Sequence, residues 1–280
     1  MFAKLFGRAR KPAPSYRPST PALPARVPGG TRVYAIGDIH GRLDLLQAMH
    51  SLVMRDALEF EGTRKVLVYL GDYVDRGVQS RETVDYLLDE PLAGFERVYL
   101  MGNHERTLLD FLIDPRVASS WMSYGGAATL YSYGVGCDGP RNNLATLTRL
   151  QESFRANLPE RHLRFYDSLA LSHMEGDYLF VHAGVKPGVP LDQQKERDLL
   201  WIRDEFLDSD ENFGKIIVHG HTITRAPEAK ENRIGIDTGA FASGKLTALV
   251  LEGDSGRFLD TGIDRRPRTA AAANGGYNGG

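Results

Sequence analysis

Three short apolar runs, each followed by glycine and a polar residue, constrain the fold of this chain most strongly. The runs TRVYAI, KVLVYL and RVYLM are rich in β-branched and aromatic residues, which favour strands. The polar residues that follow them, Asp38, Asp72 and Asn103, are 34 and then 31 residues apart, close to the ~30-residue length of a strand–helix–strand unit. Parallel strands joined by right-handed crossovers end at one edge of a sheet. The spacing therefore predicts that these three side chains lie close together.

The patterns between and after these runs predict the remaining elements. Amphipathic segments predict helices over 42–60, 80–90 and about 105–113, and residues 115–168 are expected to be helical and irregular and to cover one side of the polar edge. Strand patterns return in LALSHM, DYLFVHAG, KIIVHGHT, RIGIDTG and KLTALVLEG. Because the last of these are close together without long helices, we expect an antiparallel-leaning second sheet. The predicted fold class is α/β (α+β), with two packed sheets and outer helices.

The two ends of the chain differ in composition from its centre. Residues 1–30 hold six basic side chains, no acidic ones and six prolines, so we expect a disordered basic leader. Residues 264–280 are of low complexity and are expected to form a disordered tail, which leaves 31–263 as the folded domain. That domain holds 25 basic and 35 acidic side chains, a balance that argues against binding of duplex nucleic acid.

Two further counts limit the class of protein. No apolar run approaches the ~18 residues that a membrane-spanning helix requires, so we expect no transmembrane segment. The chain of 280 residues contains one cysteine, Cys137, which excludes an internal disulfide and a cysteine-rich zinc site. This cysteine usage is typical of a reducing compartment, and we expect a cytoplasmic protein.

Imidazole side chains accompany the polar residues at the predicted strand ends. His40 lies in GDIHG, His182 in VHAG, and His219 and His221 in VHGHT. A buried cluster of such groups requires a cation, and mixed Asp, Asn and His ligands suit manganese, iron or zinc better than calcium. The candidate ligands are too many for one ion. We therefore expect two divalent ions bridged by one carboxylate, the usual arrangement for phosphoester cleavage.

The motifs GDIHG, GDYVDRG, GNHE, HAG and GHT together resemble the signature set of the calcineurin-like metallophosphoesterases. More narrowly, they resemble the phosphoprotein-phosphatase family in its compact bacterial and phage form, over about residues 31–252. The resemblance implies a two-sheet αββα sandwich, in agreement with the strand pattern. It also implies a phosphomonoester hydrolase in which a hydroxide that bridges two metal ions attacks phosphorus. The expected metal is manganese, with iron or zinc as alternatives.

The resemblance implies a role for ten residues of this sequence. Six would hold the metals: Asp38, His40 and His221 the first ion, Asn103 and His182 the second, with Asp72 bridging them. Four would act on the substrate: Arg76 and Arg203 as phosphate-binding residues, His104 as the general acid, and Asp75 as the carboxylate that orients His104. His219 is expected to support a ligand rather than to bind the metal. Asp237 would either orient a ligand or form a structural turn.

Three functions remain open on the sequence. The first is a serine/threonine protein phosphatase, and the second is a dinucleotide hydrolase similar to the symmetrical bis(5'-nucleosyl)-tetraphosphatases, so the substrate is a phosphoprotein or a small phosphoester. The third, a catalytically dead scaffold, is disfavoured because every expected ligand is present. The dinucleotide hydrolases typically carry Ala in place of Asp75 and GNHD in place of GNHE, and both differences favour the protein phosphatase.

Overall fold

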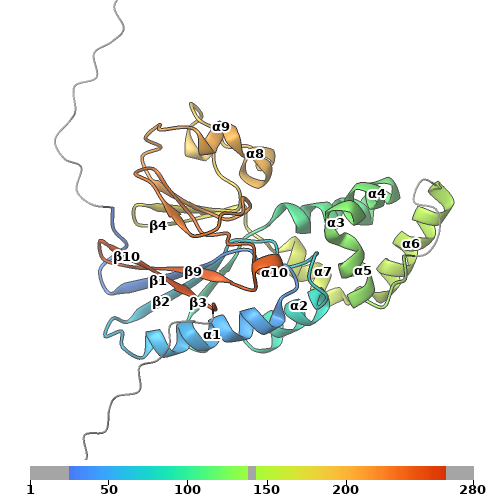
Figure 1. The fold of residues 1–280 in the computed structure, drawn as a ribbon, viewed down its shortest axis with the longest axis horizontal. Helices are drawn as coiled ribbons and strands as arrows, with labels where there is room; N and C mark the ends of the chain where they lie inside the picture. The colour runs from blue at the N-terminus through green and yellow to red at the C-terminus, as the bar shows by residue number, and fades with distance from the viewer. Residues whose placement is uncertain (1–24, 138–142, 263–280) are drawn as a thin grey trace, which may run out of the picture.

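The computed structural model describes residues 25–137 and 143–262 of the 280-residue chain. The predicted tail and residues 1–24 of the predicted leader lie outside the described residues. Two five-stranded sheets pack face to face, with helices on the outer face of each, and further helices extend from one end of this sandwich (Figure 1). The architecture agrees with the predicted fold class.

The first sheet contains the three strands on which the spacing argument depends. Its order is β10-β9-β1-β2-β3, and its strands are β1 (Thr31–Ile36), β2 (Arg64–Tyr69), β3 (Glu96–Tyr99), β9 (Thr247–Glu252) and β10 (Ser255–Asp260). β1 pairs parallel with β2, and β2 pairs parallel with β3, whereas β9 is antiparallel to both β1 and β10. The crossovers contain α1 (Leu43–Ala57) and α2 (Ser80–Asp89). The predicted parallel strands and both connecting helices are confirmed.

The second sheet differs from the expectation. Its order is β4-β5-β6-β8-β7, and its strands are β4 (Ser172–Glu175), β5 (Tyr178–Val181), β6 (Ile216–His219), β7 (Glu228–Ala229) and β8 (Arg233–Gly235). The prediction of an antiparallel-leaning sheet was only partly right. The edge strands β4 and β7 pair antiparallel with their neighbours, but the central strands β5, β6 and β8 are parallel. The short helices α8 (Glu196–Trp201) and α9 (Asp204–Leu207) lie in the β5–β6 crossover. The predicted strand 245–253 was also expected in the second sheet, but it forms β9 of the first sheet.

Alternation along the strands explains the layers. In β1, Val33 and Ala35 belong to the apolar cluster between the sheets, together with Phe180 of β5. Tyr34 and Ile36 belong to the cluster that the helices cover. Successive side chains of a strand point to opposite faces, and all six residues of β1 are buried, with apolar side chains on both faces from Val33 to Ile36. Burial on both faces fixes the register of β1 and hence the position of the residues that follow it.

The segment after β3 is helical, as expected. It contains α3 (Asn103–Ile113), α4 (Ala118–Trp121), α5 (Ala127–Ser132), α6 (Leu144–Asn157) and α7 (Glu160–Asp167), with a 3₁₀ turn at Pro115–Val117 and a π-turn at Met122–Gly126. The helix predicted from Glu105 begins two residues earlier, at Asn103. Trp121 is fully buried and packs against Phe111 and Phe154. No helix in the described part of the chain is both long and apolar enough to cross a bilayer.

The end of the predicted leader belongs to the folded body. Val27 is 2% exposed and packs in the cluster between the sheets, and its N–H donates to the Gly253 carbonyl at 2.9 Å. The Arg26 carbonyl accepts from the Asp177 N–H at 2.9 Å. The predicted boundary at residue 30 is therefore too late, because one valine among prolines has no periodicity that would reveal its burial.

Candidate active site

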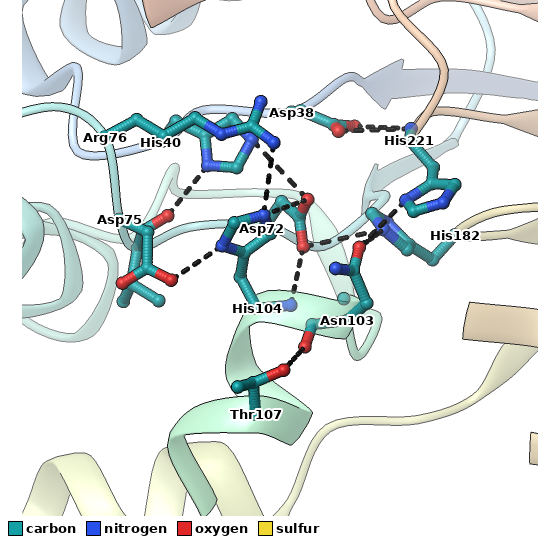
Figure 2. A network of polar contacts seen from close by, with 12 residues as sticks. Asp38, His40, Asp72, Asp75, Arg76, Asn103, His104, Thr107, His182 and His221 are labelled. Atoms are coloured by element: carbon teal, nitrogen blue, oxygen red, sulfur yellow. Dashed lines mark hydrogen bonds and ion pairs between the residues drawn. The ribbon is translucent and has the colours of Figure 1, made fainter. Parts of the chain in front are cut away.

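The carboxyl ends of strands from both sheets meet at one place. Asp38, Asp72 and Asn103 follow β1, β2 and β3, and His182 and His221 follow β5 and β6. Figure 2 shows these side chains turned toward one another. None of the five is more than 7% exposed. The structure thus brings the sequence-predicted ligands together from segments up to 183 residues apart.

The candidate ligand atoms form two groups, of which the first includes His40. His40, Asp72 and His104 each offer an atom, and these atoms lie within 4.8 Å of one another. His40 Nε2 is 3.5 Å from Asp72 Oδ2, and His104 Nε2 is 3.8 Å from the same oxygen. The Asp38 carboxylate accepts from the His221 backbone N–H at 3.1 and 3.2 Å. Asp38 is thereby held beside the cluster by the segment that follows β6.

The second group contains Asp72, His182 and His221. Asn103 Oδ1 lies 2.9 Å from His182 Nε2 and 2.8 Å from His221 Nδ1, and the two imidazole rings meet edge to face. The His221 side chain therefore belongs with Asn103 and His182, and not with Asp38 and His40 as the resemblance implied. The backbone N–H of His221 donates to Asp38, and the backbone there is left-handed, with φ 61°.

Hydrogen bonds fix which nitrogen of two histidines faces the centre. His40 Nδ1 lies 2.8 Å from the Val74 carbonyl, and His182 Nδ1 lies 2.8 Å from the Leu70 carbonyl. Each Nδ1 must donate to a carbonyl, so Nε2 presents a lone pair to the cluster. Burial lowers the pKa of His40 to about 3 and also lowers the pKa of His182. Both rings are held in the neutral form that metal ions bind.

The donor set fits divalent cations. His40 Nε2 and His221 Nε2 are buried and have no hydrogen-bond partner among the described residues, and the His182 Nε2 lone pair faces the Asn103 oxygen at 2.9 Å. Two acceptors that face each other are unfavourable unless a cation lies between them. Burial, Asp237 and Asp72 raise the pKa of Asp38 well above its usual range, as expected where buried carboxylates lie close together.

Backbone strain concentrates in the same residues. Among the described residues, the non-glycine positions with positive φ are all sequence-predicted site residues: His40, Asp72, Asp75, Arg76 and His221. Left-handed backbone costs such residues on the order of 1–3 kcal/mol each and persists where surrounding structure enforces it. Gly102 shows how close that structure comes, because a Cβ there would lie 2.2 Å from Asp72 Oδ1. The conformation of the cluster is therefore imposed by the fold.

A buried carboxylate holds the His104 ring. His104 Nδ1 lies 2.6 Å from Asp75 Oδ2, which also accepts from Trp121 Nε1 at 2.8 Å, while Asp75 Oδ1 accepts from Thr129 Oγ1 at 2.6 Å. Burial opposes a charge on His104, but attraction to Asp72 and the hydrogen-bonded Asp75 outweighs it and raises the pKa of His104 to about 9. In contrast to His40, His104 therefore carries a proton at neutral pH.

The two arginines reach the site from different directions. Arg76 follows Asp75 directly, and its Nη2 lies 3.3 Å from His104 Nε2. Arg203 lies between α8 and α9, and its Nη1 donates to the His221 carbonyl at 3.3 Å and to Thr222 Oγ1 at 3.1 Å. Both guanidinium groups therefore lie beside predicted ligands or the predicted acid.

Sequence reasoning missed the residues that support this cluster. Glu105, noted only as part of GNHE, accepts four backbone N–H bonds, from Asp72, Tyr73, Val74 and Gly102, at 2.8–3.2 Å. Trp121 and Thr129 were not predicted at all. The position of this glutamate just after a predicted strand could have indicated a role in the site. Nothing in the local sequence indicates that a tryptophan 46 residues from Asp75 is its hydrogen-bond partner.

The two uncertain residues have separate environments. Asp237 is 2% exposed, with Oδ1 accepting from the Gly239 N–H at 2.8 Å, which is the geometry of a turn. Its Oδ2 is buried without a hydrogen-bond partner among the described residues. His219 Nδ1 lies 3.1 Å from the Gly220 carbonyl, and neither group of mutually close ligand atoms includes His219.

Comparisons with known proteins show which proteins this chain is similar to. The chain is 29% identical over 232 residues to serine/threonine-protein phosphatase 2 of Salmonella typhimurium, covering 79% of this chain and 93% of that protein. It is 24% identical over 233 residues to the asymmetrical bis(5'-nucleosyl)-tetraphosphatase PrpE of Bacillus thuringiensis, covering 76% and 88%. A crystal structure provisionally named a diadenosine tetraphosphatase has the same fold, with a TM-score of 0.52, 22% identity and coverage of 85% and 98%.

The family assignment is direct. The family model of calcineurin-like phosphoesterases matches residues 31–243, a span that contains all ten predicted site residues. Members of this family use divalent metals. The chain therefore belongs to the calcineurin-like phosphoesterase family and is a phosphoester hydrolase.

Proposed function

We propose that this protein is a serine/threonine protein phosphatase that depends on two divalent metal ions, with manganese as the native pair and iron or zinc as alternatives. Its substrate is a phosphomonoester on a protein side chain. The single cysteine supports a reducing compartment, and we place the enzyme in the cytoplasm.

The buried pair of Asp75 and His104 carries this proposal. A serine or threonine alkoxide is a strongly basic leaving group and requires a proton as it departs, whereas a nucleotide phosphate leaves readily without one. The 2.6 Å contact between His104 Nδ1 and Asp75 Oδ2, with Asp75 fixed by Trp121 and Thr129, is suited to that task. His104 acts as the general acid, and Asp75 orients its ring.

The assignment of the metal ligands combines the resemblance with the contacts of the His221 ring. Asp38, His40 and Asp72 would hold one ion, and Asp72, Asn103, His182 and His221 would hold the other, so that both ions would share Asp72. When bound, the ions polarise the phosphoryl oxygens and lower the pKa of water, so that an attacking group is available near neutral pH. The protein contributes fixed neutral imidazoles through the Val74 and Leu70 carbonyls.

Arg76 and Arg203 bind the phosphoryl oxygens. Arg76 Nη2 lies 3.3 Å from His104 Nε2, so an anion beside this contact would accept from both side chains. A phosphoryl group is such an anion, and the planar guanidinium fork matches its oxygens. The contact thus supports a phosphate position between these residues.

A dinucleotide hydrolase is the second candidate. It is favoured by the similarity to proteins named bis(5'-nucleosyl)-tetraphosphatase and by exposed aromatic side chains near the site, Trp201 at 43% and Tyr124 at 62%, on which a nucleobase could stack. Trp201 contacts the His221 ring, and Tyr124 is next to Gly125, whose carbonyl accepts from the Arg76 N–H. The leaving-group argument ranks this candidate below the protein phosphatase.

Turnover of two substrates by the manganese-loaded enzyme separates the candidates. We expect kcat/KM for a phosphothreonine peptide to exceed that for diadenosine tetraphosphate by at least ~10-fold, with about 10²-fold loss for Arg76→Ala on either substrate. Asp110→Asn, a change on α3 at a half-exposed side chain that pairs with Arg106, is the matched control. Faster cleavage of the dinucleotide, with the peptide poorly cleaved, would replace the first function by the second.

A further inference from the structure

Arg76 forms no ion pair within the described part of the chain. Its carboxylate neighbour in the sequence, Asp75, is occupied by His104, Trp121 and Thr129. A guanidinium group without a carboxylate partner can adopt many rotamers, and ordering such a long side chain costs conformational entropy. Besides the 3.3 Å contact of Nη2 with His104 Nε2, a further contact is therefore needed to orient Arg76 before a phosphoryl group arrives.

The ring of Phe241 supplies that contact. Phe241 lies in α10 (Ala240–Ser243) between β8 and β9, and the Arg76 guanidinium carbon lies 4.6 Å from its ring centroid. This is within the range of a cation–π interaction. The Phe241 ring also meets the His40 ring edge to face, at 5.5 Å and 86°. One aromatic side chain thus contacts both the phosphate-binding arginine and a candidate metal ligand.

The position of Phe241 is itself fixed by contacts with loops of both sheets. The Ala240 carbonyl accepts from Arg42 Nη1 at 3.0 Å, and Arg42 follows the GDIHG motif directly. At its N-terminus α10 begins after Gly239, which has φ 68° and whose N–H donates to Asp237. The α10 turn is therefore attached to the site at both the Arg42 and the Asp237 ends.

The backbone of Arg76 is held by a different element, the π-turn at Met122–Gly126. Arg76 has φ 67°, and its N–H donates to the Gly125 carbonyl in the π-turn at 3.2 Å. Gly125 has φ 114°, and a Cβ at this position would lie 2.7 Å from Arg76 Cγ. The π-turn thus fixes where the Arg76 side chain starts, and Phe241 fixes where its charged end lies.

We propose that Phe241 is a positioning residue that holds the Arg76 guanidinium ready to bind the phosphoryl group. The inference rests on the proposed function, in which Arg76 binds phosphate. Phe241 acts through Arg76 and does not itself contact the reacting atoms. Removing the aromatic face while keeping an apolar side chain should weaken phosphate binding and turnover, and it should leave the metal ligands loaded.

The test compares Phe241→Leu and Phe241→Tyr in the full-length, manganese-loaded enzyme. We expect Phe241→Leu to raise the Kd for inorganic phosphate, measured by calorimetry, and to lower kcat/KM for p-nitrophenyl phosphate, each by roughly 3- to 30-fold. Phe241→Tyr keeps the aromatic face and should stay within about twofold of wild type. Phe258→Leu, on the exposed strand β10 and 40% exposed, is the matched control for the same substitution away from the site.

A double-mutant cycle identifies the path of the effect. In the Arg76→Ala background, Phe241→Leu should cause no further loss, because the group that it positions is absent. An equal loss in both backgrounds would mean that Phe241 contacts the substrate directly, and reduced manganese content in Phe241→Leu would mean that it acts through His40. Either result overturns the inference. If Arg76→Ala alone leaves phosphate affinity unchanged, the phosphate-binding role in the proposed function fails instead.

Discussion

At the residue scale, the site combines two electrostatic environments a few ångströms apart. Burial keeps the imidazole of His40 neutral, with a pKa of about 3, whereas Asp72 and Asp75 raise the pKa of His104 to about 9 against the same burial. The difference follows from the partner of Nδ1, which is a backbone carbonyl for His40 and a carboxylate for His104. The first arrangement suits a metal ligand and the second suits a proton donor.

The general-acid role predicts an effect that depends on the leaving group. His104→Asn should lower kcat for a phosphoserine peptide by about 10²–10⁴-fold but affect p-nitrophenyl phosphate much less, because nitrophenolate leaves without a proton. Asp75→Asn should show the same asymmetry more mildly, and Trp121→Phe, which removes one donor to Asp75, more mildly still. Parallel kinetics on both substrates, with metal content checked, provide the measurement. Equal slowing on both substrates would assign His104 to phosphate positioning.

The residues that bear chemistry were more predictable than those that support them. Asp38, Asp72 and Asn103 stand at strand ends with a regular spacing, so the sequence predicted that they meet. Trp121, Thr129 and Phe241 act only through tertiary contacts, and an aromatic residue in a helix or loop is usually part of a core. The resemblance implied that His221 accompanies Asp38 and His40, but its ring lies against Asn103 and His182, because a shared motif does not report which way a ring turns.

At the element scale, Glu105 ties α3 to the loop after β2. Its two carboxylate oxygens accept from four N–H groups, three of them in the turn that carries Asp72. The side chain is fully buried, so water cannot replace these bonds. The position of the shared ligand Asp72 therefore depends on a residue of the neighbouring crossover.

Glu105→Gln tests this tie. The amide would turn an NH₂ group toward backbone donors and leave some of them unsatisfied, at about 1–3 kcal/mol for each buried group. We expect the free energy of unfolding to fall by about 2–4 kcal/mol and bound manganese to decrease with it. Thermal melting and elemental analysis measure the two effects, with Asp110→Asn on the same helix as the control. If the variant is destabilised but its metal content is unchanged, the hydrogen bonds of Glu105 do not control metal binding.

The elements were predicted well where one long helix occupies the connection and poorly where no long helix does. The crossovers through α1 and α2 impose parallel pairing, and their spacing is visible in the sequence. The β5–β6 and β6–β8 connections contain only short helices or none, so the amphipathic pattern did not indicate the parallel pairing of these strands. Strand orientation depends on the path of the connection through space, and hydrophobic periodicity does not report it.

At the scale of the whole molecule, the sandwich places the ends of two sheets against each other. Val27 contributes to the apolar layer between them, together with Val33 and Phe180. This placement moves the start of the folded body from residue 31, as the sequence suggested, to about residue 25. The residues before 25 lie outside the described structure, and the expectation that they do not stabilise the fold remains a prediction.

Two truncations test the boundary. Removing residues 1–24 should leave the melting temperature unchanged, because that segment has no core-forming pattern. Removing residues 1–27 should lower it by roughly 5 °C, since burial of one valine contributes about 1.5–3 kcal/mol. Calorimetry of both proteins against the full chain gives the comparison. A large decrease for the shorter truncation would show that residues 1–24 stabilise the domain.

The central claim, a phosphoester hydrolase built on two divalent ions that share Asp72, is tested most directly by metal stoichiometry. Chelator-treated protein is dialysed against manganese, and bound metal per chain is measured with turnover of p-nitrophenyl phosphate in the same samples. We predict two equivalents in the wild type, with activity rising as they bind, and loss of both in Asp72→Asn at the same free manganese concentration. A wild type that saturates at one equivalent or none, or an Asp72→Asn variant that binds two, would contradict the account.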